Sequence, residues 1–230
     1  MRNLNKELII RNRLKYGHIM NLYYKQVQIL VFCLITFISN IALSQNIKVT
    51  YAYGSKDKEI QELMDFENIY SEQLIFEGTP LEGKHYEINI QEFTHGEKTN
   101  TKLLFDSSEM EFFRNNSKEL SLKFFFKISE GKLKSVVKGT HFSSAKVYNE
   151  LKDNADWYVL KDFFGSEKEW FISGNLDRDI PILAIITPSM NADGTKSYCK
   201  VVQSEIIPEE FGLHFKIPHY FLITIKFKEK

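Results

Sequence analysis

The chain has no apolar run of the length that a convincing membrane span requires, which is about 20 residues. The apolar run Val27–Ile38 has only 12 residues; Lys25 precedes it, and the small residues Ala42 and Ser44 follow it. A charged start, a short apolar centre and a small-x-small exit are typical of a secretory signal peptide. We therefore predict that residues 1–44, an upstream segment and signal peptide, are removed. The alternative is an uncleaved anchor with a basic cytoplasmic tail.

Cysteine and arginine are scarce once residues 1–44 are set aside. Cys199 is then the only cysteine, which excludes an intramolecular disulfide, and its place in the strand-like run Tyr198–Ile206 predicts a buried thiol. Taking six basic and one acidic residue from 30 of each leaves 24 basic and 29 acidic residues, a net charge of −5. Arg114 and Arg178 are the only arginines that remain. Nucleic-acid-binding proteins usually have a basic face, so we expect no nucleic-acid partner.

Motifs of established chemistry are missing as well. The chain has no G-x-S-x-G elbow, no glycine-rich phosphate loop and no complete calcium loop. Its histidines lack the paired spacing of zinc sites, so we predict neither a metal site nor a cofactor. A structural role is favoured for each of the weaker candidates. These are His85 with His95 across a hairpin, His214 with His219, His141 beside Ser143 and Ser144, Cys199 with a distant histidine, and the acidic pairs Asp177/Asp179, Glu209/Glu210 and Glu167/Glu169.

Alternation of apolar and polar residues is the dominant pattern of residues 45–230, and it is typical of strands with one buried face. The alternating runs are Ile47–Tyr51, Tyr86–Ile90, Leu122–Ile128 and Phe221–Phe227. Glycine-containing turns at Thr94–Glu97 and Ser129–Lys132 predict hairpins. We predict one mostly β domain over 45–230, either an antiparallel sandwich or a curved, partly closed sheet, with one or two short helices.

The clearest helical pattern covers Asp57–Ser71, where Ile60 and Leu63 share one stripe and Ser55 is a candidate N-cap. Val147–Leu151 is either a second short helix or another strand.

Several segments resemble parts of a known family. Gln45–Tyr51 resembles its opening strand, Lys102–Phe113 its "LLFN…ES-x-F" segment, and Glu169–Ile172 with Thr195–Val202 its "W-x-I" and "K-x-I-x-G-Y-x-C-x-K-A" segments. The family is GLPGLI, exported proteins of Gram-negative gut and environmental bacteria, and the chain resembles a divergent member because the motif that names the family is absent. The resemblance implies export and a β-rich fold, and it supplies no catalytic residues.

Phe125 is the candidate ligand-binding residue. It lies between Lys123 and Lys127, on the strand face opposite Phe124 and Phe126. A second layer covering this face is the favoured explanation. The alternative is a groove for an apolar ligand or an envelope protein partner.

The sequence therefore predicts an exported cell-envelope protein of the periplasm, outer membrane or extracellular space, acting as a non-catalytic binding or interaction module. The alternative is a periplasmic hydrolase with a cleft of carboxylates and histidines.

Export has a direct test. N-terminal sequencing of the protein recovered from the envelope of its native host should begin at Gln45 or within a residue or two of it. Mature material that still begins at Met1 or Met20 would contradict cleavage.

Overall fold

The computed structural model describes residues 28, 46–165, 167–190, 194–198, 201 and 206–228. The chain divides into two units, Met1–Gln45 and Asn46–Lys230. The predicted signal peptide falls outside the described residues, except for residue 28, and so does Cys199 with most of the strand predicted around it. Within the described part, no helix has the length and apolar character needed to cross a membrane.

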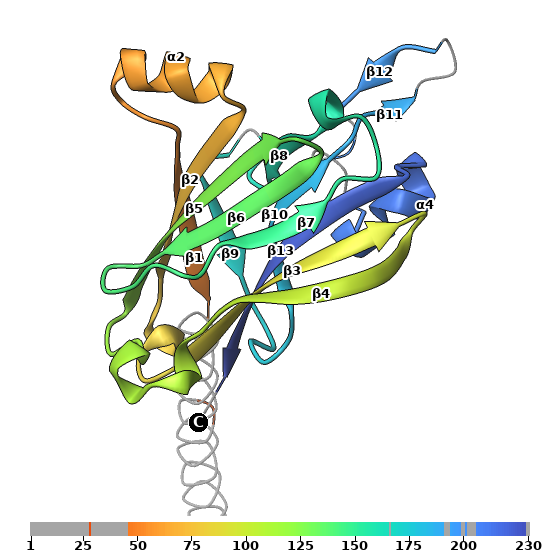
Figure 1. Cartoon of the computed structure of the whole chain (residues 1–230). Coiled ribbons are helices and arrows are strands. Elements are labelled where there is room, and N and C mark those ends of the chain that lie inside the picture. The colour runs from red at the N-terminus through yellow and green to blue at the C-terminus, as the bar shows by residue number, and fades with distance from the viewer. Residues whose placement is uncertain are drawn as a thin grey trace, which may run out of the picture. The chain divides into compact units, whose positions relative to one another are not determined.

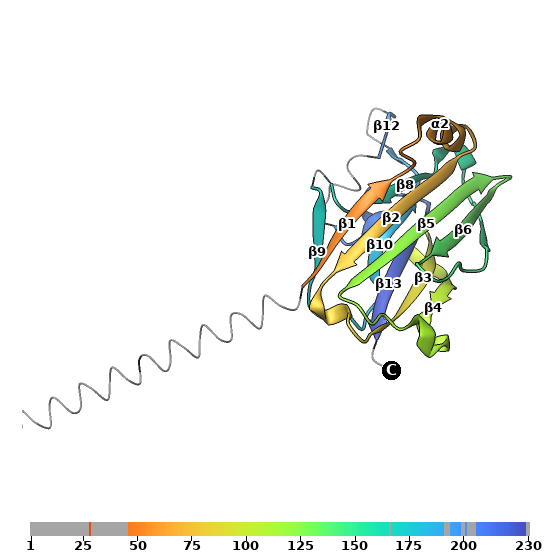
Figure 2. The same cartoon turned by 90° about the vertical axis from the view of Figure 1, so that its left-hand side faces the viewer.

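Two antiparallel sheets face each other and form a sandwich, which confirms the first of the two predicted folds. One sheet has the order β7-β6-β5-β2-β1-β9 and the other β4-β3-β13-β10-β8, with a separate β11-β12 pair. Figure 1 shows the strands, and Figure 2 shows the six-stranded sheet in front of the five-stranded one. The strands are β1 (Ile47–Tyr53), β2 (Ile69–Glu77), β3 (His85–Thr94), β4 (Glu97–Asp106), β5 (Glu119–Ser129), β6 (Lys132–Lys138), β7 (Val147–Glu150), β8 (Val159–Asp162), β9 (Glu169–Ile172), β10 (Ile180–Ile186), β11 (Ser189–Met190), β12 (Lys196–Ser197) and β13 (His219–Lys228).

The predicted hairpins are present, and each turns through two residues of positive φ. Glu130 and Gly131 join β5 to β6 with φ of 54° and 69°, and His95 and Gly96 join β3 to β4 with φ of 52° and 86°. Positive φ at both turn residues matches the right-handed twist of the paired strands. These turns set which residues of the paired strands lie opposite each other.

The main helix is shorter than the sequence pattern predicted. Helix α2 covers Lys58–Phe66, and Asp57 rather than Ser55 is its N-cap, accepting hydrogen bonds from the amides of Glu59 and Ile60. The prediction extended too far because the residues from Ile69 onward pair with β5 instead. A second helix, α4, covers Phe211–Phe215, and the ambiguous segment beginning at Val147 is the strand β7.

Apolar residues form two buried clusters, one on each face of the five-stranded sheet. The larger lies between the sheets and includes Phe124 and Phe126 of β5. The smaller contains residues of β10 and β13 together with Phe211 of α4, so every residue of β10 is buried. Phe125 belongs to neither cluster and is half-buried. The favoured prediction of a covering layer is therefore wrong at Phe125, although it describes β10.

Two neighbouring phenylalanines provide a matched test of this arrangement. Phe124→Ala should lower the free energy of unfolding by about 3–5 kcal/mol, because a fully buried ring leaves a cavity. Phe125→Ala should lower it by less than about 1 kcal/mol, because that ring is only half-buried. Urea unfolding of both variants measures the difference. Equal losses would show that a second layer covers both faces of β5.

Candidate functional site

The outer face of the six-stranded sheet carries a hollow centred on Phe125, which we call the lysine groove. Its volume is about 360 Å³. Its floor is apolar, with Phe125 and Val136 directly opposite each other on β5 and β6. The groove is lined by Ile69, Phe125, Phe126, Lys127, Lys134, Val136, Lys138, Ser143, Ser144 and Lys146.

The β5–β6 hairpin contains two cross-strand pairs of lysines, and in each pair the two lysines lie directly opposite each other. Lys123 pairs with Lys138 and Lys127 with Lys134, one pair on each side of the Phe125–Val136 pair. Like charges in directly opposite positions destabilise a sheet. Two such pairs flank the half-buried Phe125, so positive charge is concentrated there at a cost to stability.

Only one of these lysines has a carboxylate partner. Lys127 forms an ion pair of 2.7 Å with Glu67, at the end of α2. Within the described residues, Lys123, Lys134, Lys138 and Lys146 have no carboxylate within ion-pair distance. The groove therefore holds more positive charge than the protein itself neutralises.

Phe125 provides partial compensation. The ammonium groups of Lys123 and Lys138 lie 5.3 and 5.4 Å from its ring centroid, which is cation–π range. At an exposed site each such contact is worth about 0.5–1 kcal/mol. The two contacts place the ring between the two charges, and Lys138 also lines the groove.

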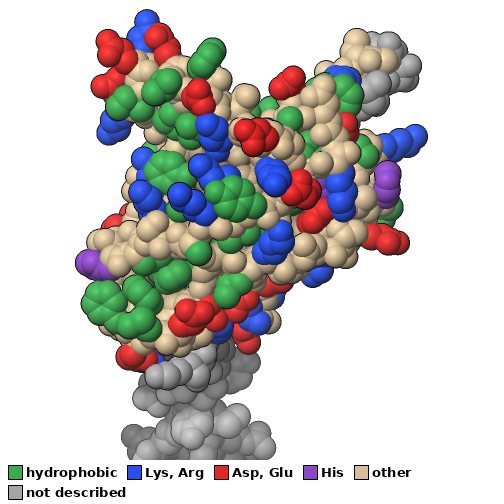
Figure 3. All heavy atoms as spheres, in the orientation of Figure 1, with side chains coloured by type: hydrophobic (Ala, Val, Ile, Leu, Met, Phe, Trp, Pro, Cys, Tyr) green, Lys and Arg blue, Asp and Glu red, His purple; other side chains and the backbone are tan. Residues whose placement is uncertain are grey.

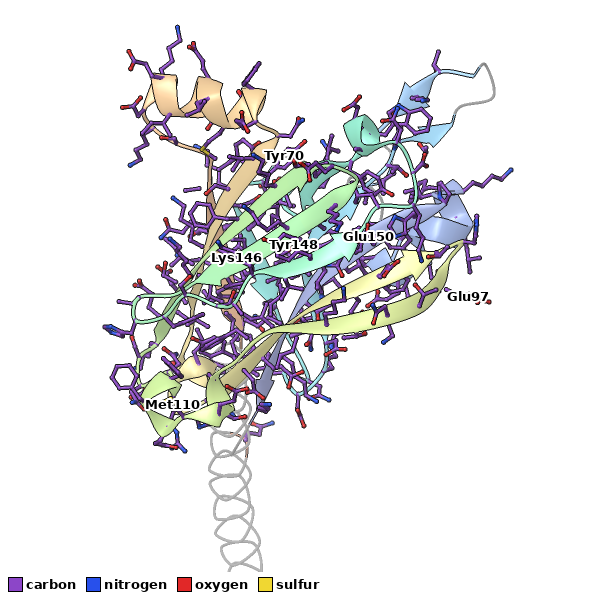
Figure 4. The ribbon with its side chains drawn as sticks, in the orientation of Figure 1. Tyr70, Glu97, Met110, Lys146, Tyr148 and Glu150 are labelled. Atoms are coloured by element: carbon purple, nitrogen blue, oxygen red, sulfur yellow. The ribbon has the colours of Figure 1, made fainter. Side chains whose placement is uncertain are left out.

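The pictures show how the charge is distributed over this face. In Figure 3, blue lysine and arginine side chains surround green apolar groups over the region of β5, β6 and β7. Figure 4 labels Lys146, Tyr148 and Glu150 in succession along the β7 side of the same face. The basic and apolar groups thus belong to one continuous surface.

The lining of the lysine groove combines apolar and positively charged groups. Among the residues that the structure describes, it contains no histidine, cysteine or carboxylate of the kind that general acid–base chemistry uses. It offers an apolar floor and a rim of ammonium groups. That combination suits a ligand with both an apolar part and a negative charge.

The structure does not bring together the histidine pairs considered from the sequence. His85 opens β3 and His95 follows its last residue, so about 33 Å of strand separates them. His85 is buried, with Nδ1 3.1 Å from the Ser107 carbonyl oxygen. His214 is exposed on α4, whereas His219 is buried in β13.

Among the remaining candidates, Ser144 and Asp179 have structural partners. Ser144 accepts a hydrogen bond from the Val137 amide and donates one to the Ala145 carbonyl oxygen, while His141 is exposed. Asp179 accepts a hydrogen bond from the Gln91 side chain.

Sequence reasoning missed a buried polar cluster around His219. His219 Nδ1 is hydrogen-bonded to the Tyr158 hydroxyl, and Nε2 lies 3.2 Å from Glu92 Oε1. Lys152 forms an ion pair of 2.7 Å with Glu92. Burial lowers the pKa of His219 and outweighs its hydrogen bond to Glu92. Since His219 and Tyr158 are each only 1% exposed, we assign the cluster to holding the segment before β8 against the sheet.

Glu72 is a second buried polar group that the sequence did not reveal. It lies in phase with the inward residues Leu74 and Phe76 of β2, and one carboxyl oxygen has no hydrogen-bond partner within the described part of the chain. Burial, and then the nearby Asp162 carboxylate, raise the pKa of Glu72 to about 8. Glu72 is therefore mainly protonated and uncharged at pH 7. It does not line the lysine groove.

Comparison of the chain with family models, with curated proteins and with solved structures finds no match. The resemblance to the GLPGLI family therefore stays a hypothesis that rests on its short strand-like segments. In the described part of the chain, no group of three or more His, Cys, Asp or Glu side chains is arranged to hold a metal ion. The fold and site together define an antiparallel β-sandwich with an open basic and aromatic groove on one sheet.

Glu72 generates a prediction about pH. Its pKa is raised on folding, so the folded state binds more protons than the unfolded state between about pH 4.5 and pH 8. Stability should therefore fall as the pH rises through this range, by up to about 1.4 kcal/mol per pH unit. Glu72→Gln should remove that fall, measured by urea unfolding at pH 5, 6.5 and 8.

Glu77→Gln is the matched control, because Glu77 lies on the same strand and is exposed enough to pair with Lys48 at the surface. It should keep the wild-type pH dependence. If the free energy of unfolding falls equally with pH in the wild type and in Glu72→Gln, the raised pKa assigned to Glu72 is contradicted.

Proposed function

We propose that this protein is an exported cell-envelope binding protein, without catalysis, whose lysine groove binds an anionic ligand that has an apolar part. The proposal rests on one observation: two cross-strand pairs of lysines flank the Phe125–Val136 pair, one on each side. An anion in the groove relieves the repulsion within both pairs at once. The ligand's apolar part covers the Phe125 ring, whose exposed area otherwise faces water.

Several observations support binding over the hydrolase alternative. Glu72, the carboxyl group whose pKa burial raises to about 8, is 2% exposed and does not line the groove. His219 is buried with Tyr158. A hydrolase needs its acid and base groups within reach of substrate.

Lys138→Glu tests whether the positive charge of Lys138 contributes to ligand binding. It converts the Lys123–Lys138 pair into a pair of opposite charges, which adds about 0.2–1 kcal/mol of stability. It also removes the Lys138 cation–π contact with Phe125, which costs about 0.5–1 kcal/mol, so the free energy of unfolding should stay within about 1 kcal/mol of the wild type. The same change should weaken binding of an anionic apolar dye such as anilinonaphthalene sulfonate at least about tenfold. Dye fluorescence titration and urea unfolding on the same samples measure both quantities. A variant of nearly unchanged stability that binds the dye less tightly is the expected result.

Phe125→Ala should weaken dye binding by a similar factor with little loss of stability, as expected for an aromatic anchor. Lys98→Glu is the matched control, since Lys98 is an exposed lysine of β4 in the other sheet. Its dye affinity should equal that of the wild type. Unchanged affinity in both Lys138→Glu and Phe125→Ala would refute the proposal.

A further inference from the structure

The lysine groove shares lining residues with one neighbouring hollow and adjoins another through residues next to it in the chain. The aromatic hollow, about 670 Å³, includes Ser121 of β5 and Gly139, the residue after Lys138. The tyrosine hollow, about 240 Å³, shares Lys127 and Lys134 with the lysine groove. Along β5, the outward residues from Glu119 to Ser129 therefore pass all three hollows, a distance of about 33 Å.

The aromatic hollow has a different chemical character from the groove beside it. Its walls include the rings of Phe112, Phe113 and Phe142, and Phe112 is 66% exposed. Arg114 of the lining is already paired with Glu111 at 2.8 Å, and the lining also includes the carboxylate of Glu119. The hollow is thus close to neutral, and its remaining polar side chains are amides, hydroxyls and the His141 ring.

The tyrosine hollow continues the basic character of the lysine groove. Lys132 and Lys134 line it together with Tyr148, which is 50% exposed. One carboxylate, that of Glu130, is also in its lining. Along the track the chemistry therefore changes from neutral and aromatic at one end to basic and aromatic at the other.

We propose that the three hollows form one track that binds a linear glycan bearing both neutral sugars and anionic groups. This inference rests on the proposed function and names its ligand class. Aromatic rings recur along the track, exposed at Phe112 and Tyr148 and half-buried at Phe125. The C–H face of a sugar packs on the electron-rich face of such a ring. The lysines take the anionic groups, and the amides and hydroxyls take the sugar hydroxyls.

The charge distribution distinguishes this ligand from other long anions. Nucleic acid and polyphosphate carry a negative charge at every unit, so they favour basic side chains along the whole track. The aromatic hollow instead presents Glu119 and an already paired Arg114. A small anion would contact only a small part of a lined surface about 33 Å long.

Hyaluronan oligosaccharides, which alternate an acidic and a neutral sugar, are suitable probes. Calorimetric titration at low salt should show affinity rising at least about tenfold from the tetrasaccharide to the decasaccharide as the longer chain reaches the outer hollows. Phe112→Ala and Tyr148→Ala should each lower the affinity for the decasaccharide about tenfold. Each should change the affinity for anilinonaphthalene sulfonate by less than about twofold.

Phe171→Ala is the matched control. Phe171 lies opposite Lys48 at the far edge of the same sheet and is 52% exposed, so it resembles Tyr148 in exposure but lies away from the track. Its decasaccharide affinity should be that of the wild type. Thermal melting of each variant confirms that the exposed substitutions leave the fold intact.

The outcomes separate this inference from the proposed function. If a polyphosphate of equal charge binds as tightly as the decasaccharide and Phe112→Ala has no effect, the glycan assignment is overturned while anion binding stands. The glycan assignment is likewise overturned if the dye binds and the decasaccharide does not, or if affinity is independent of chain length. If Lys138→Glu lowers the affinity for neither the dye nor the glycan, the proposed function itself fails.

Discussion

The register of the β5–β6 hairpin is the constraint on which both the core and the candidate site depend. The two-residue turn at Glu130 and Gly131 sets Phe125 opposite Val136. A shift of one residue would move Phe124 and Phe126 out of the core and turn the lysines into it. Core burial and the turn therefore enforce the same register, and that register forces like charges into opposite positions on the outer face. The repulsion is a consequence that the fold tolerates and a ligand can relieve.

The two sheets differ in how they are covered, and this difference decides where a ligand has access. In the five-stranded sheet, β10 and most of β13 are buried on both faces, with α4 contributing to the outer cluster, whereas β4 is mostly exposed. On the six-stranded sheet, the Phe125 face instead carries the lysine groove. Its inner face contains an uncharged Glu72 at neutral pH, which makes the core sensitive to alkaline conditions but leaves the outer face unaffected. Stability and binding are thus properties of opposite faces of one sheet.

Part of the candidate site could be predicted from the sequence. The Lys123–Phe125–Lys127 pattern identified a lysine-flanked aromatic, and the turn at Glu130–Gly131 contains enough information to place Lys134 and Lys138 opposite those lysines. Counting outward from a two-residue turn gives each cross-strand pair. The lysine pairs were missed because the face was expected to be covered. Glu72 was missed for another reason: the pattern placed it just past a helix, so its phase within β2 was not considered.

The sequence by itself determined the strands β1, β3, β5 and β13, the two hairpins and the alternation that separates inner from outer residues, because these follow from side-chain periodicity and turn chemistry over short distances. It also determined that the chain offers no known catalytic motif. Only the tertiary structure decided that β2 lies beside β5, that the Phe125 face stays open, and that Tyr158, His219 and Glu92 meet. Those outcomes depend on which segments pack together across long stretches of chain, and local periodicity contains no information about that choice.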